Sequence, residues 1–184
     1  PLHQDWNIVD ESTSRSFNIW IPLVNVDEQN GAVKALAGSH MKRTSYRGPN
    51  LELEHQNIST EVLPLLASIP MNAGDALVHD HALWHASGPN NSNSIRQALV
   101  IGCTMRGVQL KFYYQEERGL AEYNANVQFY QFGEAINGPG NLQLSKIVNH
   151  EAKQMSIEEF NMDFLGTSPQ KKSWFAGLME VFKK

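Results

Sequence analysis

The sequence predicts a mainly β fold, a sandwich or barrel of short strands, with helices added toward its C-terminal end. Three observations predict it. Apolar and polar residues alternate over residues 16–24, which is the two-residue period of a strand. Further short apolar runs follow, and Asn, Gly and Pro residues separate them. The chain has 184 residues, of which 41% are hydrophobic, so we expect one domain over residues 1–184.

The first predicted strand, residues 16–24, has two different faces because successive side chains point to opposite sides of a strand. One face carries Asn18 and Trp20. The other carries the apolar side chains of Phe17, Ile19, Ile21 and Leu23. Trp20 therefore points away from the apolar set.

The next elements follow turn signals along the chain. Residues 32–37 are apolar and follow Gln29-Asn30-Gly31, which predicts a second short strand. Residues 41–60 are polar and irregular, and we expect a loop that forms a substrate lid. The apolar run over residues 62–69 precedes Gly74-Asp75, which turns the chain into a strand that carries histidines.

A β-hairpin is predicted around the turn-forming block of residues 88–93, because apolar residues flank this block on both sides. With a pivot at Asn90-Asn91, His85 lies opposite Arg96. Directly opposed residues on antiparallel strands point to the same face, so the two side chains would be neighbours.

His3 and Asp5 are two residues apart and would project to the same side of an extended segment. Two imidazoles and one carboxylate on one face of an ion form a ligand set that suits iron(II) and leaves open positions. Alternation along a strand leaves three candidates for the second imidazole. His79, His81 and His85 are separated by even numbers of residues and would all point to the same side.

Arg96 stands just before the apolar run of residues 98–101, which predicts a strand inside a sheet. An arginine in such a place needs an anionic partner. The planar guanidinium can hold a carboxylate through two hydrogen bonds and stays charged at any working pH. We therefore expect Arg96 to hold an acid cosubstrate beside the metal.

The motifs together form an ordered set: His3-Gln4-Asp5, Trp20-Ile21-Pro22-Leu23, Asn30-Gly31, Gly38-Ser39-His40, Gly74-Asp75, His85 in His-Ala-Ser-Gly-Pro-Asn, and Arg96. In this order, residues 3–104 resemble the phytanoyl-CoA dioxygenase family of iron(II)- and 2-oxoglutarate-dependent oxygenases. The resemblance implies a double-stranded β-helix, a jelly-roll or cupin-like barrel, over residues 1–104. A last strand and a C-terminal helical extension would occupy residues 105–184.

The resemblance also implies roles for individual residues. The iron ligands would be His3, Asp5 and His85. Arg96 would bind the distal carboxylate of 2-oxoglutarate, with Trp20 and Ser87 near this cosubstrate. His40, which also fits a turn-capping role, and Gln4 are candidates for contact with the substrate.

The reaction implied by the resemblance uses iron(II), 2-oxoglutarate and O2, hydroxylates a small organic or acyl substrate, and releases succinate and CO2. The alternative is a non-catalytic module that binds a metal or small molecule. A zinc hydrolase would have no use for Arg96, and a structural zinc site usually draws on cysteines. The segment that family members carry before their His-x-Asp motif is absent here, so we expect an exposed sheet edge that self-association could cover.

Composition excludes several other classes. The net charge of −4 shows no basic bias toward nucleic acid. The single cysteine, Cys103, excludes an intramolecular disulfide and is expected to be buried in a strand. No apolar stretch is long enough for a membrane span and no secretory leader is visible, so we expect a cytoplasmic protein.

Other charged residues carry weaker expectations. Lys42, Arg43 and Arg47 in the predicted loop would meet the phosphates of a thioester substrate, or would form a solvated face. His55 and His150 lie in polar stretches and are expected to be solvated.

Beyond the resemblance, residues 110–114 predict one more strand, and residues 115–140 give no clear period. Ser156 and Glu159 form a capping-box pattern, so a helix is expected to begin there and run to about Leu165. From Ser173 an apolar stripe predicts a helix packed on the domain or, alternatively, one that binds a membrane surface or partner. The stripe comprises Trp174, Phe175, Leu178, Met179 and Phe182.

Overall fold

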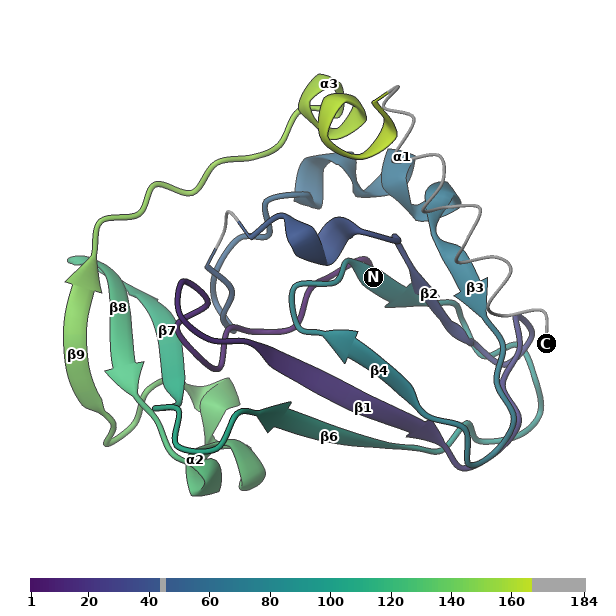
Figure 1. Cartoon of the computed structure of the whole chain (residues 1–184), viewed down its shortest axis with the longest axis horizontal. Coiled ribbons are helices and arrows are strands. Elements are labelled where there is room, and N and C mark those ends of the chain that lie inside the picture. The colour runs from purple at the N-terminus through teal and green to yellow at the C-terminus, as the bar shows by residue number, and fades with distance from the viewer. Residues whose placement is uncertain (44–45, 167–184) are drawn as a thin grey trace.

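The computed structural model describes residues 1–43 and 46–166, and over these residues the fold is mainly β (Figure 1). The strands form three antiparallel sheets of three strands each, and the few helices are short. This confirms the predicted class and is consistent with a cupin-like fold. The predicted helix from Ser173 lies outside the described residues. No helix in the described part of the chain is long and apolar enough to cross a membrane.

The first sheet has the order β4-β1-β6 and holds the two-faced strand. Its strands are β1 (Ser16–Pro22), β4 (Leu77–Asp80) and β6 (Ala98–Thr104). In β1, Trp20 is buried, whereas Val78, which pairs with Ile19 on the apolar face, is 60% exposed. The face that carries Asn18 and Trp20 therefore points inward, and the apolar face is the outer one.

The second sheet has the order β3-β2-β5, formed by β2 (Val33–Ala35), β3 (Ala67–Ile69) and β5 (His85–Ser87). A bridge between His3 and His85 adds the N-terminal segment beside β5. Along the chain, β1, β4 and β6 belong to the first sheet, while β2, β3 and β5 belong to the second (Figure 1). The chain thus passes repeatedly between the two sheets.

The predicted hairpin between His85 and Arg96 is wrong. β5 pairs with β2, and β6 pairs with β1, so the two strands belong to different sheets. The turn-forming residues between them build a connection from one sheet to the other, in which Asn91 N donates to Gln29 O at 2.8 Å. Turn formers suit a hairpin and a crossover equally, and sequence spacing does not distinguish them.

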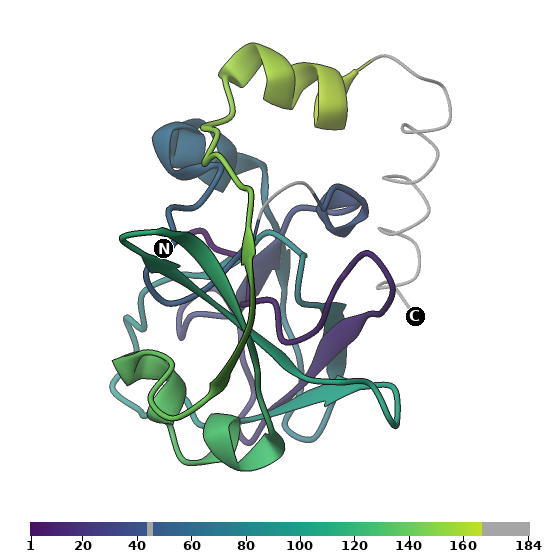
Figure 2. The same cartoon turned by 90° about the vertical axis from the view of Figure 1, so that its left-hand side faces the viewer.

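The third sheet follows these two and has the order β7-β8-β9. It consists of β7 (Lys111–Glu116), β8 (Gly119–Asn124) and β9 (Gln143–Val148). Only the strand near residues 110–114 was expected. α2 (Val127–Gln131) and the 3-10 turn η4 (Glu134–Asn137) connect β8 to β9, and Figure 2 views the molecule from this side. The division of the chain at residue 104 stays a prediction.

Short helices cover the second sheet and enclose an aromatic core. They are η1 (Ser39–Met41), η2 (Gln56–Ile58), α1 (Ser59–Val62), η3 (Leu63–Leu65), α3 (Ile157–Phe160) and the π-helical turn η5 (Asn161–Leu165). The predicted capping box is confirmed, because Glu159 N donates to Ser156 Oγ at 3.1 Å and Ser156 N donates to Glu159 Oε2 at 2.9 Å. α3 and η5 pack Phe160 and Phe164 on Trp84.

The expectations about exposure are wrong for His55 and Cys103 and hold in part for His150. His55 is fully buried, with its ring centroid 4.4 Å from that of Trp84, and this burial lowers its pKa to about 4. His150 is half-buried and meets the ring of Tyr46 edge-on. Cys103 is half-exposed rather than buried. Long-range packing decides these positions, and local polarity does not reveal it.

Candidate metal centre and cosubstrate site

His3 and His85 are brought together by a pair of backbone hydrogen bonds. His3 N donates to His85 O at 2.9 Å, and His85 N donates to His3 O at 2.9 Å. Residues paired in this way in an antiparallel ladder point their side chains to the same face. The two imidazole centroids are 4.2 Å apart.

Asp5 completes the cluster on the same side of the N-terminal segment. Its backbone N donates to His81 O at 3.0 Å, which holds this part of the segment beside the residue that follows β4. One ligand atom from each of His3, Asp5 and His85 lies within 4.8 Å of the other two. Among the described residues, these three form the group of histidine, cysteine and carboxylate side chains that lies close enough together to hold a metal ion.

Both imidazoles are held in the tautomer that leaves Nε2 free to bind a metal. His3 Nδ1 lies 3.0 Å from Pro1 O, and His85 Nδ1 lies 2.9 Å from Leu83 O. Because a carbonyl oxygen only accepts, each Nδ1 carries the hydrogen, and each Nε2 keeps its lone pair for a metal. Burial lowers the pKa of His85 to about 4, so this ring is neutral near pH 7. These donors fit an iron(II) ion.

The two other candidate histidines lie beside the cluster. His81 is buried, its Nδ1 is 3.1 Å from Ser16 Oγ, and burial lowers its pKa. His79 Nδ1 lies 3.9 Å from Asp5 Oδ2 and 3.3 Å from Asp80 O. The residue that the geometry groups with His3 and Asp5 is therefore His85 rather than His79 or His81.

The carboxylate of Asp5 is oriented by a residue that the sequence did not single out for this role. Asn18 Nδ2 donates to Asp5 Oδ2 at 2.9 Å, from the inner face of β1. The alternation of β1 already placed Asn18 on the face of Trp20. What the sequence could not show was that this face meets the N-terminal segment.

Arg96, Trp20 and Ser87 come together at one place. Arg96 Nη1 donates to Gly31 O and lies 3.3 Å from Ser87 Oγ, and its guanidinium carbon is 5.7 Å from the Trp20 ring centroid. Arg96 stands two residues before β6 rather than within a strand, which corrects the expected position. Within the described residues it forms no ion pair, so its charge remains available to an anion.

The metal cluster and the arginine lie at adjacent positions along β1. Asn18 touches Asp5, and Trp20 lies under Arg96, two residues further along the same face. Two residues of a strand span about 6.6 Å. A small diacid could therefore meet the cluster with one end and the guanidinium with the other.

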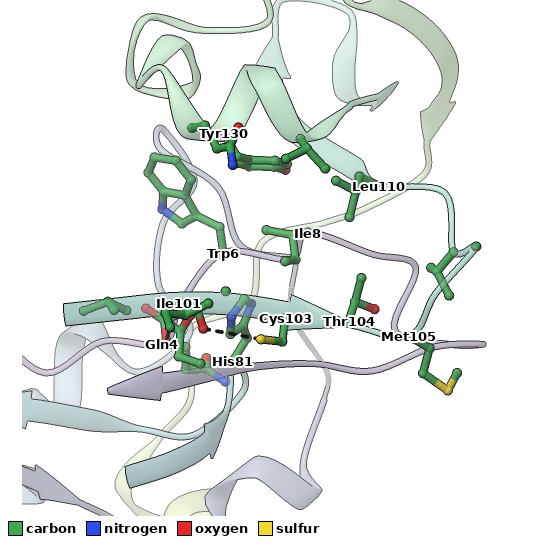
Figure 3. Close-up of a pocket in the computed structure, with 18 of the residues that line it drawn as sticks. Gln4, Trp6, Ile8, His81, Ile101, Cys103, Thr104, Met105, Leu110 and Tyr130 are labelled. Carbon is green, nitrogen blue, oxygen red and sulfur yellow. Dashed lines mark hydrogen bonds between the residues drawn. The ribbon is translucent and has the colours of Figure 1, made fainter. Parts of the chain in front are cut away.

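A cavity of about 840 Å³ opens beside the cluster, between β6, the turn that follows it, and α2. Figure 3 shows Tyr130 and Leu110 on one side, and Gln4, His81 and Cys103 on the other. His3, Asp5 and Asn18 also belong to its wall. Gln4 is buried, with Nε2 donating to Ala82 O at 2.8 Å. His40 is half-buried in η1 and is not part of this wall.

The three basic residues of the predicted loop are engaged elsewhere. Lys42 pairs with Asp163, and Arg43 pairs with Asp80. Arg47 is buried and holds Glu11 with Nη2 2.5 Å from Oε1. Neither a thioester-binding role at the cavity nor a fully solvated face fits these contacts.

Comparison with known proteins decides the family. The sequence model described as Phytanoyl-CoA dioxygenase (PhyH) matches residues 1–98. The chain belongs to the phytanoyl-CoA dioxygenase family. This confirms the resemblance, and the family uses iron(II), 2-oxoglutarate and O2.

One relative of this member of the phytanoyl-CoA dioxygenase family is named a dioxygenase. "Dioxygenase olcK" of Penicillium canescens is 34% identical over 107 residues, which are 54% of this chain and 32% of that protein. The chain therefore spans about a third of that relative's length.

Two solved structures are also similar. AviO1 of Streptomyces viridochromogenes has 28% identity and a TM-score of 0.42, covering 59% of this chain and 44% of that one. EvdO2 of Micromonospora carbonacea, complexed with 2-oxoglutarate, has 25% identity and a TM-score of 0.41, covering 59% and 48%.

Proposed function

We propose that this chain forms the catalytic core of an iron(II)- and 2-oxoglutarate-dependent dioxygenase that hydroxylates a small organic substrate. The observation that carries the proposal is the cluster of His3, Asp5 and His85, in which both imidazoles present Nε2 and the carboxylate is held by Asn18. In the overall reaction, substrate, 2-oxoglutarate and O2 give hydroxylated substrate, succinate and CO2.

The three ligands would hold iron(II) on one face and leave the opposite positions open. Iron(II), when bound, supplies the oxygen-activating chemistry. The Nδ1 hydrogen bonds of His3 and His85 fix the ring orientations, and Asn18 fixes the carboxylate.

Arg96 would bind the distal carboxylate of 2-oxoglutarate. Its Nη1 is used by Gly31 O and Ser87 Oγ, which fixes the plane of the guanidinium and leaves its other N–H groups for a carboxylate. Trp20 supports the cation from below. The Ser87 hydroxyl, 3.3 Å from Arg96 Nη1, would contact the same carboxylate. Gln4 and His40 remain proposed substrate contacts, and only Gln4 lines the cavity.

We also propose that the first two sheets form a double-stranded β-helix. Support comes from the topology, in which the chain passes repeatedly between two sheets over residues 1–104 and a bridge at His3 adds the N-terminal segment to the second one. β4 and β6 each pair with one strand only in the described chain, so both sides of that sheet have a free edge. A homo-oligomer that covers such an edge is part of this proposal, and light scattering of the purified chain tests it.

A non-catalytic module that binds a metal or small molecule is the second candidate, because the cluster of His3, Asp5 and His85 could hold a metal ion without supporting turnover. One experiment separates the dioxygenase from the binding module. The protein is mixed anaerobically with iron(II) and 2-oxoglutarate, and the weak visible absorption band of the complex is recorded. Oxygen is then admitted and succinate is measured. A band without succinate, even with candidate substrates, favours the binding module.

Matched variants make the test specific. His85→Ala and Arg96→Ala should abolish or strongly weaken the band, whereas His150→Ala and Arg118→Ala should not, because these two side chains lie outside the cluster. A wild-type protein without the band, or an Arg96→Ala variant with an unchanged band, contradicts the proposed site.

A further inference from the structure

The cavity beside the cluster has a largely apolar wall. Several of its apolar side chains are exposed to solvent, with Val100 54%, Met105 60% and Val127 53% exposed. Exposed apolar surface gathered in a concave site favours an occupant that removes it from water. The other apolar members of the wall are Trp6, Ile8, Ile101, Val108 and Leu110.

The wall carries almost no charge. Among the described residues that line the cavity there is no lysine or arginine, and Asp5 is its one carboxylate. Arg106 belongs to the same turn as Met105 and Gly107 but does not line the cavity. Lys42, Arg43 and Arg47 are paired with acids. An anionic ligand would lose its hydration here without gaining a lysine or arginine side chain as a partner.

Two aromatic rings contribute flat surface to the wall, those of Trp6 and Tyr130. The Tyr130 hydroxyl donates to Lys111 O, so its hydrogen is already used. Burial raises the pKa of this hydroxyl, which keeps it neutral. The ring is therefore left to pack against a hydrophobic body rather than to bind a polar group.

We propose that this cavity takes a neutral, largely apolar substrate, with a ring or hydrocarbon body, and discriminates against molecules that carry a carboxylate or phosphate. The inference rests on the proposed oxygenase function, since it names the substrate class of that site. The body of the substrate would lie against Val100, Leu110 and Tyr130, with one end reaching the side of His3 and Asp5.

Two fluorescent probes of nearly the same shape test this preference on the full, metal-free chain. N-phenyl-1-naphthylamine is neutral, and 8-anilino-1-naphthalenesulfonate adds one negative charge. We expect the neutral probe to bind at least about tenfold more tightly, which corresponds to about 1.4 kcal/mol. Because no iron or 2-oxoglutarate is present, the outcome is independent of whether the chain turns over.

Two valine variants locate the binding site. Val127 lines the cavity and is 53% exposed, while Val78 lies on the outer face of β4 and is 60% exposed, so a lysine at either position threatens the fold equally little. Val127→Lys should weaken binding of the neutral probe by about fivefold or more and strengthen binding of the sulfonate. Val78→Lys should change neither. Val108→Lys, also in the wall, should repeat the effect of Val127→Lys.

Two results overturn the proposal. One is a wild-type protein that binds the sulfonate as tightly as the neutral probe. The other is neutral-probe binding that survives both cavity variants but is lost in Val78→Lys, which would assign the apolar binding to the outer sheet face. Neither result changes the outcome of the iron and 2-oxoglutarate test, which is measured separately.

Discussion

Asn18 Nδ2 donates a hydrogen bond to Asp5 Oδ2 across 2.9 Å, joining the middle of β1 to the N-terminal segment. This contact holds the oxygen that would otherwise rotate freely about the carboxylate axis. Loss of a partner that orients a metal-binding side chain typically costs about 10- to 100-fold in metal affinity or activity.

Asn18→Ala should therefore weaken metal binding by about tenfold or more, without removing a ligand. Titration of the metal-free protein with iron(II) or cobalt(II) under argon measures the change. Asn93→Ala, at an exposed position in the connection before β6, is the matched control. Equal affinities for Asn18→Ala and wild type would show that the hydrogen bond does not orient the ligand.

The third ligand can be assigned by replacing histidines one at a time. His85→Ala should lose stoichiometric cobalt(II) binding, because the remaining pair offers too few donors in one place. His81→Ala should keep it, since the His81 ring lies beside Ser16 rather than in the cluster. Ligand-field absorption of bound cobalt reports both. Loss of binding in His81→Ala with retention in His85→Ala would reverse the assignment.

Arg96→Lys tests whether the fork of the guanidinium matters, beyond its charge. Lysine keeps a positive charge but loses the planar pair of donors and most of the contact with the Trp20 ring. We expect the dissociation constant for 2-oxoglutarate to rise by about tenfold or more. Calorimetric titration with iron or cobalt present measures it, and Arg118→Lys, on an exposed arginine, should leave it unchanged.

The buried His55 predicts a pH dependence of stability. Its pKa falls from 6.5 to about 4 because burial disfavours the charged ring, so the unfolded chain binds more protons between these values. The free energy of unfolding should then decrease as the pH falls through this window, by up to about 3 kcal/mol from this group. Above pH 6.5 the group is neutral in both states and contributes no slope.

His55→Phe removes that titration while keeping a ring beside Trp84. Urea unfolding of the metal-free variant between pH 4.5 and about 7 should show a flatter profile than wild type. His150→Phe, at a half-buried position, serves as the control. Parallel profiles for His55→Phe and wild type would mean that His55 does not carry the predicted effect.

Ser156→Ala should lower the free energy of unfolding by about 1 kcal/mol, because it removes the acceptor that caps α3. The loss would be felt in the aromatic core, since α3 carries Phe160 onto Trp84. Chemical unfolding measures it. Ser145→Ala, on an exposed position of β9, is expected to cost less, and an equal cost would argue against the cap.

Much of the site could be predicted from sequence where a local rule applied. The period of two placed His3 with Asp5, and Asn18 with Trp20, and the structure keeps both relations. The capping box at Ser156 is equally local and was also found.

What failed depends on contacts between distant parts of the chain. His85 reaches the site by pairing with His3, across more than eighty residues, rather than through a hairpin with Arg96. Choosing between a hairpin and a crossover requires knowing which strands are free to pair, and no short window contains that. The burial of His55 against Trp84 is another such case.

The inner face of β1 sets the distance between the two ends of the proposed cosubstrate site. Because Asn18 contacts Asp5 and Trp20 contacts Arg96, the rise of an extended strand sets the spacing between the two contacts that support the ends of the proposed cosubstrate site. The site would then select its diacid cosubstrate by length, because the spacing along the strand fixes the distance between its two ends. A diacid one carbon shorter than 2-oxoglutarate would reach one end only, and one that is longer would have to bend.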